Sequence, residues 1–331
     1  MRVVVAGTSF GRVYLDAVGS DLVGILARGS AYSAECAASR GVPLYTSVDE
    51  VPDVDVACVV LKSGALGGPG TEIARAFLKR GVHVLQEHPV HADEIASLLR
   101  EARAAGVSYA VNTLYPNLSP VRRFLAVAQV LQRHQRIEFI DAACNSQVLY
   151  PLIDVLGRIA GLRPWEFGPV SRGGPFVSLH GRIGGIPLTL RVQNEVHPED
   201  PDNHSFFLHR ITIGCEGGVL ELADTHGPVL WNPRLHSPRD SAGRLIMDAE
   251  RLSTPNVVVL GSAVSYVDVF AKLWPEAVSR ALADLHDPAG RQWALSVSTA
   301  WRELSAVLGL PALIRPAEPG VIPLDEILAV S

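Results

Sequence analysis

The stretch VVVAGTSFG at residues 3–11 decides the fold. Its first four residues form a short apolar run, as expected for a strand that is buried on both faces of a parallel sheet. A glycine turn follows at once, and residues 11–17 have the pattern of a helix. A strand, a glycine turn and a helix in this order are typical of a dinucleotide phosphate site, where backbone N–H groups face the pyrophosphate. The residues that this pattern assigns to the cofactor are Gly7, Thr8, Ser9, Phe10 and Gly11.

The turn is one residue shorter than G-x-G-x-x-G, and Ser9 stands near the usual second glycine, so a plain tight turn is the alternative. The residues that follow favour the cofactor site, because strands and helices keep alternating. Such alternation predicts an α/β fold in which residues 1–116 form a Rossmann domain with a parallel sheet. Expected strands cover 22–27, 54–61, 82–86 and 107–112, and expected helices cover 33–39, 71–80 (with Thr71 as a candidate cap) and 91–105.

The pattern changes after residue 116. Glycine pairs at 184–185 and 217–218 indicate two hairpins between apolar strands. We therefore expect residues 117–331 to form an α+β domain for substrate binding and oligomerisation, with an open, mostly antiparallel sheet and helices on one face. Its C-terminal segment can pack back on the first domain. Expected helices cover 119–133, 152–161, 266–285 and 289–308, and expected strands cover 137–146, 176–183, 187–195, 206–215 and 219–223.

Composition excludes several classes of protein. The chain has 331 residues, of which 48% are hydrophobic, and a net charge of −5, so it has enough apolar surface for two packed domains and no basic excess for a nucleic acid. No apolar run is long enough to span a membrane or to act as a signal peptide, which predicts a cytoplasmic protein. None of the four cysteines lies in a C-x-x-C pair, so all four are expected to be buried thiols.

The end of the second strand distinguishes between the two nicotinamide cofactors. An enzyme that uses NAD usually has an acid there for the ribose hydroxyls, whereas this chain has Arg28, Ser30 and Ser33. Arginine and serine bind a 2′-phosphate, so the sequence predicts NADPH, with a solvent-exposed arginine as the alternative. Lys62 and Ser63 follow the strand at 54–61 and are also assigned to the cofactor, although Lys62 can equally be a rim lysine.

Two side chains with acid–base chemistry follow neighbouring strands. Glu87 and His88 end one strand, and Tyr115 comes directly after the next, on the edge where ligands bind in open α/β sheets. We expect Glu87 to contact the cofactor and His88 or Tyr115 to donate a proton. The alternatives are a structural imidazole and a packing aromatic ring. His91 follows soon after, but the further ligands that a metal would need are not evident, so no metal is predicted.

This layout resembles the glucose–fructose oxidoreductase, inositol dehydrogenase and MocA family, which pairs a Rossmann domain with a sheet that lines the substrate site. Most members carry Glu-Lys-Pro where this chain has Glu87-His88-Pro89. They also carry D-x-G-x-H, which aligns with residues 147–151, so Gln147 and Pro151 stand where the family has its acid and its histidine. A sugar dehydrogenase needs a base to remove the hydroxyl proton, and this chain lacks the usual set.

The segments GTSFGRVYL, ILARGSAYS, GGPGTEIA, GVHVLQEHPVH and VNTLYP resemble one branch, the thiazolinyl imine reductases of siderophore biosynthesis. The resemblance implies NADPH-dependent reduction of a thiazoline C=N to a thiazolidine. It also implies a substrate tethered through phosphopantetheine to a carrier domain of a nonribosomal peptide synthetase. His88 and Tyr115 match the candidate proton donors of that branch. Three residues where a strand meets a loop are expected near the substrate mouth: Asn194, Glu195 and His197.

Two other functions stay open at this point. One is an NADP-dependent dehydrogenase of a sugar or cyclitol within the same family. The other is a non-catalytic NADPH-binding sensor. In each case a homodimer is expected, and neither nucleic acid nor a membrane is a predicted partner.

Overall fold

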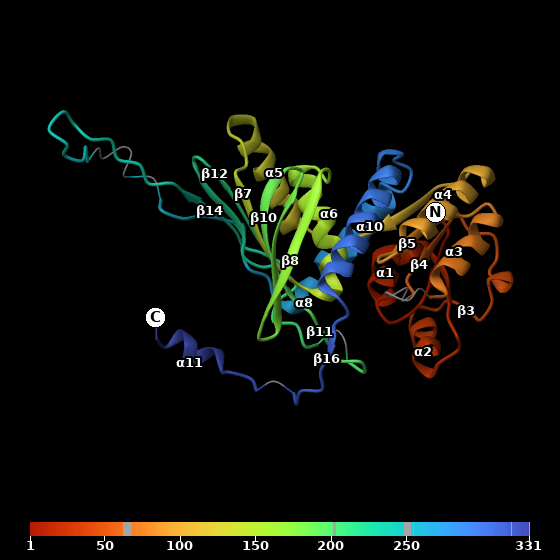
Figure 1. Ribbon diagram of the computed structural model, residues 1–331. Coiled ribbons are helices and arrows are strands. Elements are labelled where there is room, and N and C mark those ends of the chain that lie inside the picture. Colours follow the sequence, from red (N-terminus) through yellow and green to blue (C-terminus); the bar gives the residue numbers. More distant parts are fainter. Residues whose placement is uncertain (62–67, 201–202, 248–252, 254, 319, 331) are drawn as a thin grey trace.

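The first sheet is a parallel Rossmann sheet (Figure 1). The computed structural model describes all residues except 62–67, 201–202, 248–252, 254, 319 and 331. The strands of the first sheet are ordered β3-β2-β1-β4-β5-β6, and neighbouring strands run parallel. β1 and β4 are buried along their whole length, which explains their unbroken apolar sequences. The strands are β1 (Val3–Ala6), β2 (Leu22–Leu26), β3 (Leu44–Tyr45), β4 (Val56–Val59), β5 (His83–Glu87) and β6 (Tyr109–Asn112). The helices between them are α1 (Gly11–Val18), α2 (Ala31–Ser39), α3 (Gly70–Lys79) and α4 (Ala92–Ala105).

The second sheet has eight strands in the order β15-β14-β13-β12-β7-β10-β9-β8. Every neighbouring pair is antiparallel except β7 and β10, which run parallel. The α/β fold with a Rossmann domain and a mostly antiparallel second sheet is therefore confirmed. The strands are β7 (Phe139–Asn145), β8 (Trp165–Gly173), β9 (Phe176–Ile183), β10 (Ile186–Gln193), β12 (His209–Cys215), β13 (Gly218–Leu222), β14 (Val229–Pro233) and β15 (Val258–Leu260). α5 (Ser119–His134) and α6 (Leu149–Ala160) pack against this sheet and lie on the same side of it in Figure 1.

The last long helices return to the first domain. α9 (Trp274–Ala283) packs on α1, and α10 (Ala289–Leu308) contacts α4 and β6 on one side and α6 and β8 on the other. Figure 1 shows α10 standing between the two sheets. The hydroxyl of Ser298 on α10 donates a hydrogen bond to the carbonyl of Val90 (2.7 Å), so α10 is attached to the loop that follows β5. Beyond α10, β16 (Ala312–Leu313) pairs with β11 (Glu195–Val196), and α11 (Leu324–Leu328) is the last helix of the described residues.

Two details of the sequence prediction were wrong. Thr71 does not cap α3, because the helix begins one residue earlier and the Thr71 hydroxyl donates instead to Glu94 of α4 (2.8 Å). The helix expected at 266–285 is interrupted: a short helix α8 (Tyr266–Asp268) leads into a π-helix (Val269–Leu273) before α9. Pro275 accounts for the interruption, because it lacks an N–H and its ring clashes with the carbonyl four residues before it in a regular helix. The wider π turn accommodates this.

Candidate active site

The glycine turn after β1 has the geometry that its sequence requires. Gly7 has a φ of +106°, and a Cβ there would lie 2.2 Å from the carbonyl oxygen of Val60, so only glycine fits. Its N–H donates to the carbonyl of Leu26 (2.9 Å), which connects the ends of β1 and β2, and the N–H of Val60 donates to the carbonyl of Ala6 (2.8 Å), which connects β4 to β1. No side chain of the described residues caps the start of α1 at Phe10, and Ser9 is exposed. This helix N-terminus is therefore suited to an anionic cofactor phosphate.

The turn after β2 separates the three residues that sequence assigned to the 2′-phosphate. Arg28 and Ser30 are exposed. Ser30 caps α2, since its hydroxyl accepts from the N–H of Ser33 (3.2 Å). Ser33 is buried, and its hydroxyl donates to the Ser30 carbonyl (2.8 Å), so Ser33 supports the turn from within. Lys62 and Ser63 lie outside the described residues.

A buried hydrogen-bond network connects the ends of β5 and β6 to α1. The hydroxyl of Tyr14 donates to the carboxylate of Glu87, and the Asn112 amide donates to the Tyr14 hydroxyl (2.6 Å) and to Glu87 (3.3 Å). Burial, together with the neighbouring carboxylate, holds the pKa of Tyr14 well above its usual value, so the phenol keeps its proton and remains a donor. Sequence reasoning missed Tyr14 and Asn112 as site residues. The strand-edge argument that selected Glu87 applies equally to Asn112, whereas nothing in the sequence distinguishes Tyr14.

His88 presents one ring nitrogen to two acceptors. Nδ1 lies 2.8 Å from Oε1 of Glu87 and 3.2 Å from the carbonyl oxygen of Asn112. Because both partners can only accept, Nδ1 carries a proton, and Nε2 is the nitrogen left for another group. The side chain is 9% exposed. When the ring carries both protons, Nε2–H is therefore the proton that it can give away.

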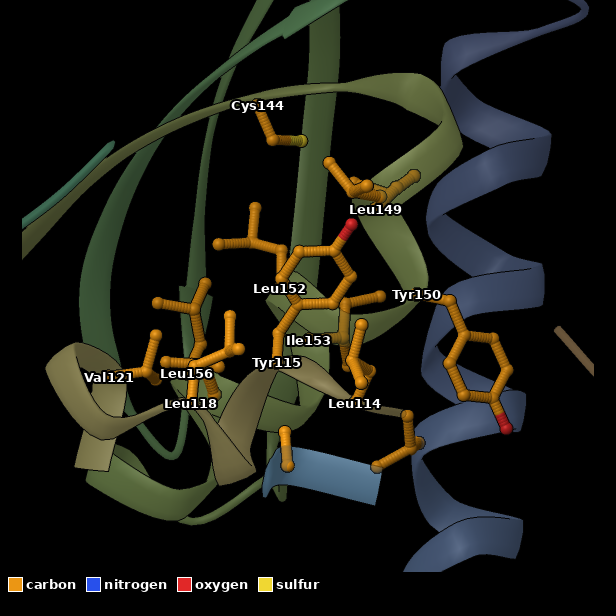
Figure 2. Packing of buried hydrophobic residues seen from close by; sticks show 14 of the residues in the cluster. Leu114, Tyr115, Leu118, Val121, Cys144, Leu149, Tyr150, Leu152, Ile153 and Leu156 are labelled. Atoms are coloured by element: carbon orange, nitrogen blue, oxygen red, sulfur yellow. The ribbon is translucent and has the colours of Figure 1, made fainter. Parts of the chain in front are cut away.

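Tyr115 lies where the two domains meet. Its ring makes an edge contact with the ring of His88 (centroids 6.2 Å apart) and a closer one with the ring of His209 (4.8 Å). Figure 2 shows the Tyr115 ring among the apolar side chains of α6, with its hydroxyl directed toward Leu149. Tyr150 stacks on His88 from another side, with centroids 5.7 Å apart. The structure thus brings together His88 and Tyr115, which the sequence had only placed on one edge.

His209 at the start of β12 is a buried member of this cluster that sequence reasoning missed. Nε2 lies 2.8 Å from the carbonyl oxygen of Val148, and Nδ1 lies 3.1 Å from the Thr225 hydroxyl. Burial lowers the pKa of His209 to about 4, so the ring is neutral and carries its proton on Nε2, facing the carbonyl. No sequence signal could have found it, because its partners lie 61 and 16 residues away along the chain.

The three residues expected at the substrate mouth make their described contacts with the end of α10, with β16 and with His204. The Asn194 amide is buried and donates to the carbonyls of Leu308 (3.3 Å) and Gly309 (3.2 Å), at the end of α10. Glu195 lies in β11, and His197 stacks on His204 with centroids 4.9 Å apart. None of these contacts involves His88 or Tyr115, so a role at the mouth stays a prediction.

Other features set limits on the site. An open surface hollow of about 450 Å³ lies between α1 and α9 and is lined by residues such as Asp16, Lys272 and Arg280, and His88 is not one of its lining residues. Within the described ranges, no group of three or more His, Cys, Asp or Glu side chains could hold a metal ion. Across the same residues, no helix is both long enough and apolar enough to cross a membrane.

Comparisons with known proteins agree with this architecture. Residues 1–113 match a family described as an oxidoreductase family with an NAD-binding Rossmann fold, and residues 135–232 match a family described as thiazolinyl imine reductase Irp3-like, C-terminal. No curated protein matches the chain.

Similar solved structures show the fold alone, because their sequence identities are low. A 3-ketoreductase from Actinomadura kijaniata, in complex with TDP-benzene and NADP, is 17% identical, with a TM-score of 0.66 over 96% of this chain and 99% of that one. A UDP-N-acetylglucosamine 3-dehydrogenase from Acidithiobacillus ferrooxidans is 15% identical, with a TM-score of 0.66 over 93% and 97%. The first domain thus matches a family with an NAD-binding Rossmann fold, and the second domain matches the C-terminal domain of a thiazolinyl imine reductase family. The chain therefore joins a Rossmann domain of the GFO/IDH/MocA oxidoreductase family, at residues 1–113, to an Irp3-like C-terminal domain, at residues 135–232.

Proposed function

We propose that the protein reduces a thiazoline C=N to a thiazolidine with NADPH, on an intermediate tethered to a carrier domain during siderophore biosynthesis. The observation that carries this proposal is the match of residues 135–232 to the C-terminal domain of thiazolinyl imine reductases. His88 supports it, since an imine needs a proton at nitrogen as hydride arrives at carbon, and imidazole is suited to giving one near neutral pH.

The chain's own residues account for the proton. Reduction of C=N adds hydride to carbon and a proton to nitrogen, and the bound nicotinamide supplies the hydride. Glu87 and the Asn112 carbonyl accept from Nδ1 of His88 and so fix the ring, which would leave Nε2 to face the reacting nitrogen. The Tyr115 hydroxyl is the second candidate donor, because its ring lies beside that of His88. Which of the two donates is decided by the variants described below.

Residues of the first domain would hold the cofactor. The turn at 7–11 would receive the pyrophosphate at the start of α1, and Arg28 and Ser30 would receive the 2′-phosphate of NADPH. Glu87 has its carboxylate engaged by Tyr14, Asn112 and His88, so it would act on the cofactor side mainly by fixing these three side chains. We further propose a cytoplasmic homodimer and a phosphopantetheine-bearing carrier domain as the partner.

One assay distinguishes this function from the two alternatives. The protein is incubated with NADPH and a synthetic hydroxyphenyl-thiazoline mimic, and NADPH absorbance and product mass are followed. We expect NADPH consumption and a product that has gained two hydrogens, with NADH less effective. Oxidation of sugars or cyclitols with NADP, and no reduction of the mimic, would indicate a dehydrogenase instead. Cofactor binding without hydride transfer to any of these compounds would indicate a sensor.

A further inference from the structure

The backbone directly before Tyr115 is strained. Leu114 is fully buried and has a φ of 57° and a ψ of −62°, and it is the one residue other than glycine with positive φ in the described chain. The N–H of Tyr115 donates to the carbonyl of Thr113 (2.6 Å). These dihedral angles and this hydrogen bond define a γ-turn of the positive-φ kind, which is rare and unfavourable for a bulky residue. Such strain persists only where the surroundings hold it in place.

The two residues before Leu114 hold the turn from opposite sides. Oδ1 of Asn112 accepts from the N–H of Leu114 (2.9 Å), while its amide nitrogen donates to Tyr14 and Glu87 in the first domain. The Thr113 hydroxyl donates to Asp154 on α6, in the second domain. Asp154 is itself buried and also accepts from Trp293 of α10 (2.7 Å). The turn is therefore anchored in both domains at once.

We propose that Asn112 is a positioning residue that holds the strained turn at Leu114 and thereby sets Tyr115 against His88. The same amide group contacts Glu87, which fixes the His88 ring, so one side chain sets both candidate proton donors. This inference deepens the proposed function and rests on it for the role of Tyr115. The strain itself and its anchors do not depend on which substrate is reduced.

A matched pair of variants at Leu114 tests the strain. Leu114→Ala and Leu114→Gly remove almost the same buried side chain, but glycine adopts positive φ freely. At an ordinary buried position the glycine variant melts below the alanine variant, because glycine loses more conformational freedom on folding. Here we expect the reverse, with Leu114→Gly melting at the higher temperature. A glycine variant that melts below the alanine variant would overturn the claim of strain, whatever the enzyme reduces.

A double-variant cycle tests whether Asn112 acts through Tyr115. Asn112→Ala should lower kcat for the thiazoline mimic roughly tenfold, since small misplacement of a reacting group is costly, with little change in the Kd for NADPH. In a Tyr115→Phe background, Asn112→Ala should cause a clearly smaller loss of kcat, because only the part that acts through Glu87 and His88 remains. The full tenfold loss in that background would overturn the coupling. If the native protein does not reduce the mimic at all, the proposed function fails, while the Leu114 melting order still decides the strain.

Discussion

Tyr115 lies between two histidines that come from different domains and differ in exposure and in their other hydrogen-bond partner. His88 ends a parallel strand, keeps 9% of its side chain exposed and turns Nδ1 to a carboxylate. His209 begins an antiparallel strand, is enclosed and has both ring nitrogens within hydrogen-bond distance of Val148 and Thr225. The same side chain is thus a proposed proton donor in one place and a neutral structural link in the other. Partners and burial decide between the two roles, and the residue type does not.

The largest expected effect is on kcat, when His88 or Tyr115 is replaced. His88→Ala and Tyr115→Phe should each lower kcat, and loss of the true donor should cost on the order of 10²–10⁴-fold, because general acid catalysis contributes that much. Steady-state rates with the thiazoline mimic measure this, and a Kd for NADPH close to that of the native protein provides the control.

The double variant distinguishes two arrangements. A combined loss beyond either single loss indicates two independent donors, whereas a double variant equal to the worse single variant indicates one relay. Native rates in the double variant at every pH would show that neither residue is the acid and that water or the substrate supplies the proton.

The second prediction concerns how His209 makes the stability of the protein depend on pH. Because burial lowers its folded-state pKa to about 4, the folded protein does not take up the proton that an unfolded histidine binds below a pH of about 6.5. The contribution of this group to stability is present above pH 6.5 and is lost as the pH falls toward 4. The loss amounts to about 3 kcal/mol. Denaturant unfolding across this pH range measures it.

His209→Gln is the matched control for this titration. A glutamine amide can still donate to the carbonyl of Val148 but does not titrate. We expect its free energy of unfolding to fall less than that of the native protein between pH 6.5 and pH 4. Parallel curves for the two proteins would contradict a neutral buried His209 and would remove the contrast with His88.

The third prediction concerns the cofactor. Arg28→Ala should weaken NADPH binding roughly 10–150-fold and leave NADH binding little changed, because a charge-assisted phosphate contact is worth about 1.5–3 kcal/mol. Titration with each cofactor measures the two Kd values. Ser33→Ala is the comparison variant, since its buried hydroxyl bonds to Ser30 and should matter less for the choice of cofactor. Equal affinities of the native protein for both cofactors would disprove the preference.

The smallest expected effect is at Asn194. Asn194→Ala leaves carbonyls at the end of α10 without their buried donor, which should cost about 1–2 kcal/mol of stability. An unchanged KM for the thiazoline mimic beside this loss would show that Asn194 acts only at the end of α10. A raised KM with unchanged stability would instead support the predicted place of Asn194 at the substrate mouth.

The first domain could be predicted closely because its signals are local. All the longer strands and helices there are continuous segments with their own apolar pattern, and the glycine turn lies between two of them. The two-residue strand β3 was not expected. The second sheet was harder to predict. β8 is an edge strand with mostly exposed or half-exposed residues, so it lacks the alternation that reveals a strand, and the short strand β14 was not expected.

The residues of the candidate site also fall into those that the sequence could reveal and those that it could not. His88 and Tyr115 were accessible to sequence reasoning because residues that follow parallel strands gather at one edge of the sheet. Tyr14 and His209 were not, since their roles depend on hydrogen bonds to residues 73 and 61 positions away. The strained turn at Leu114 was also beyond reach, because nothing in a leucine between Thr113 and Tyr115 indicates a positive φ.

The return of α10 to the first domain has a consequence for how the protein is made. The ribosome completes β6 long before it reaches α10, and at 5–20 residues per second the interval is about 10–40 s. During that time α10 does not yet cover the surface of α4 and β6 that it contacts in the finished structure. The nascent Rossmann domain therefore presents an unfinished face to chaperones and proteases. Emergence of α10, rather than completion of the first domain, is the event that closes this face and brings Trp293 to Asp154.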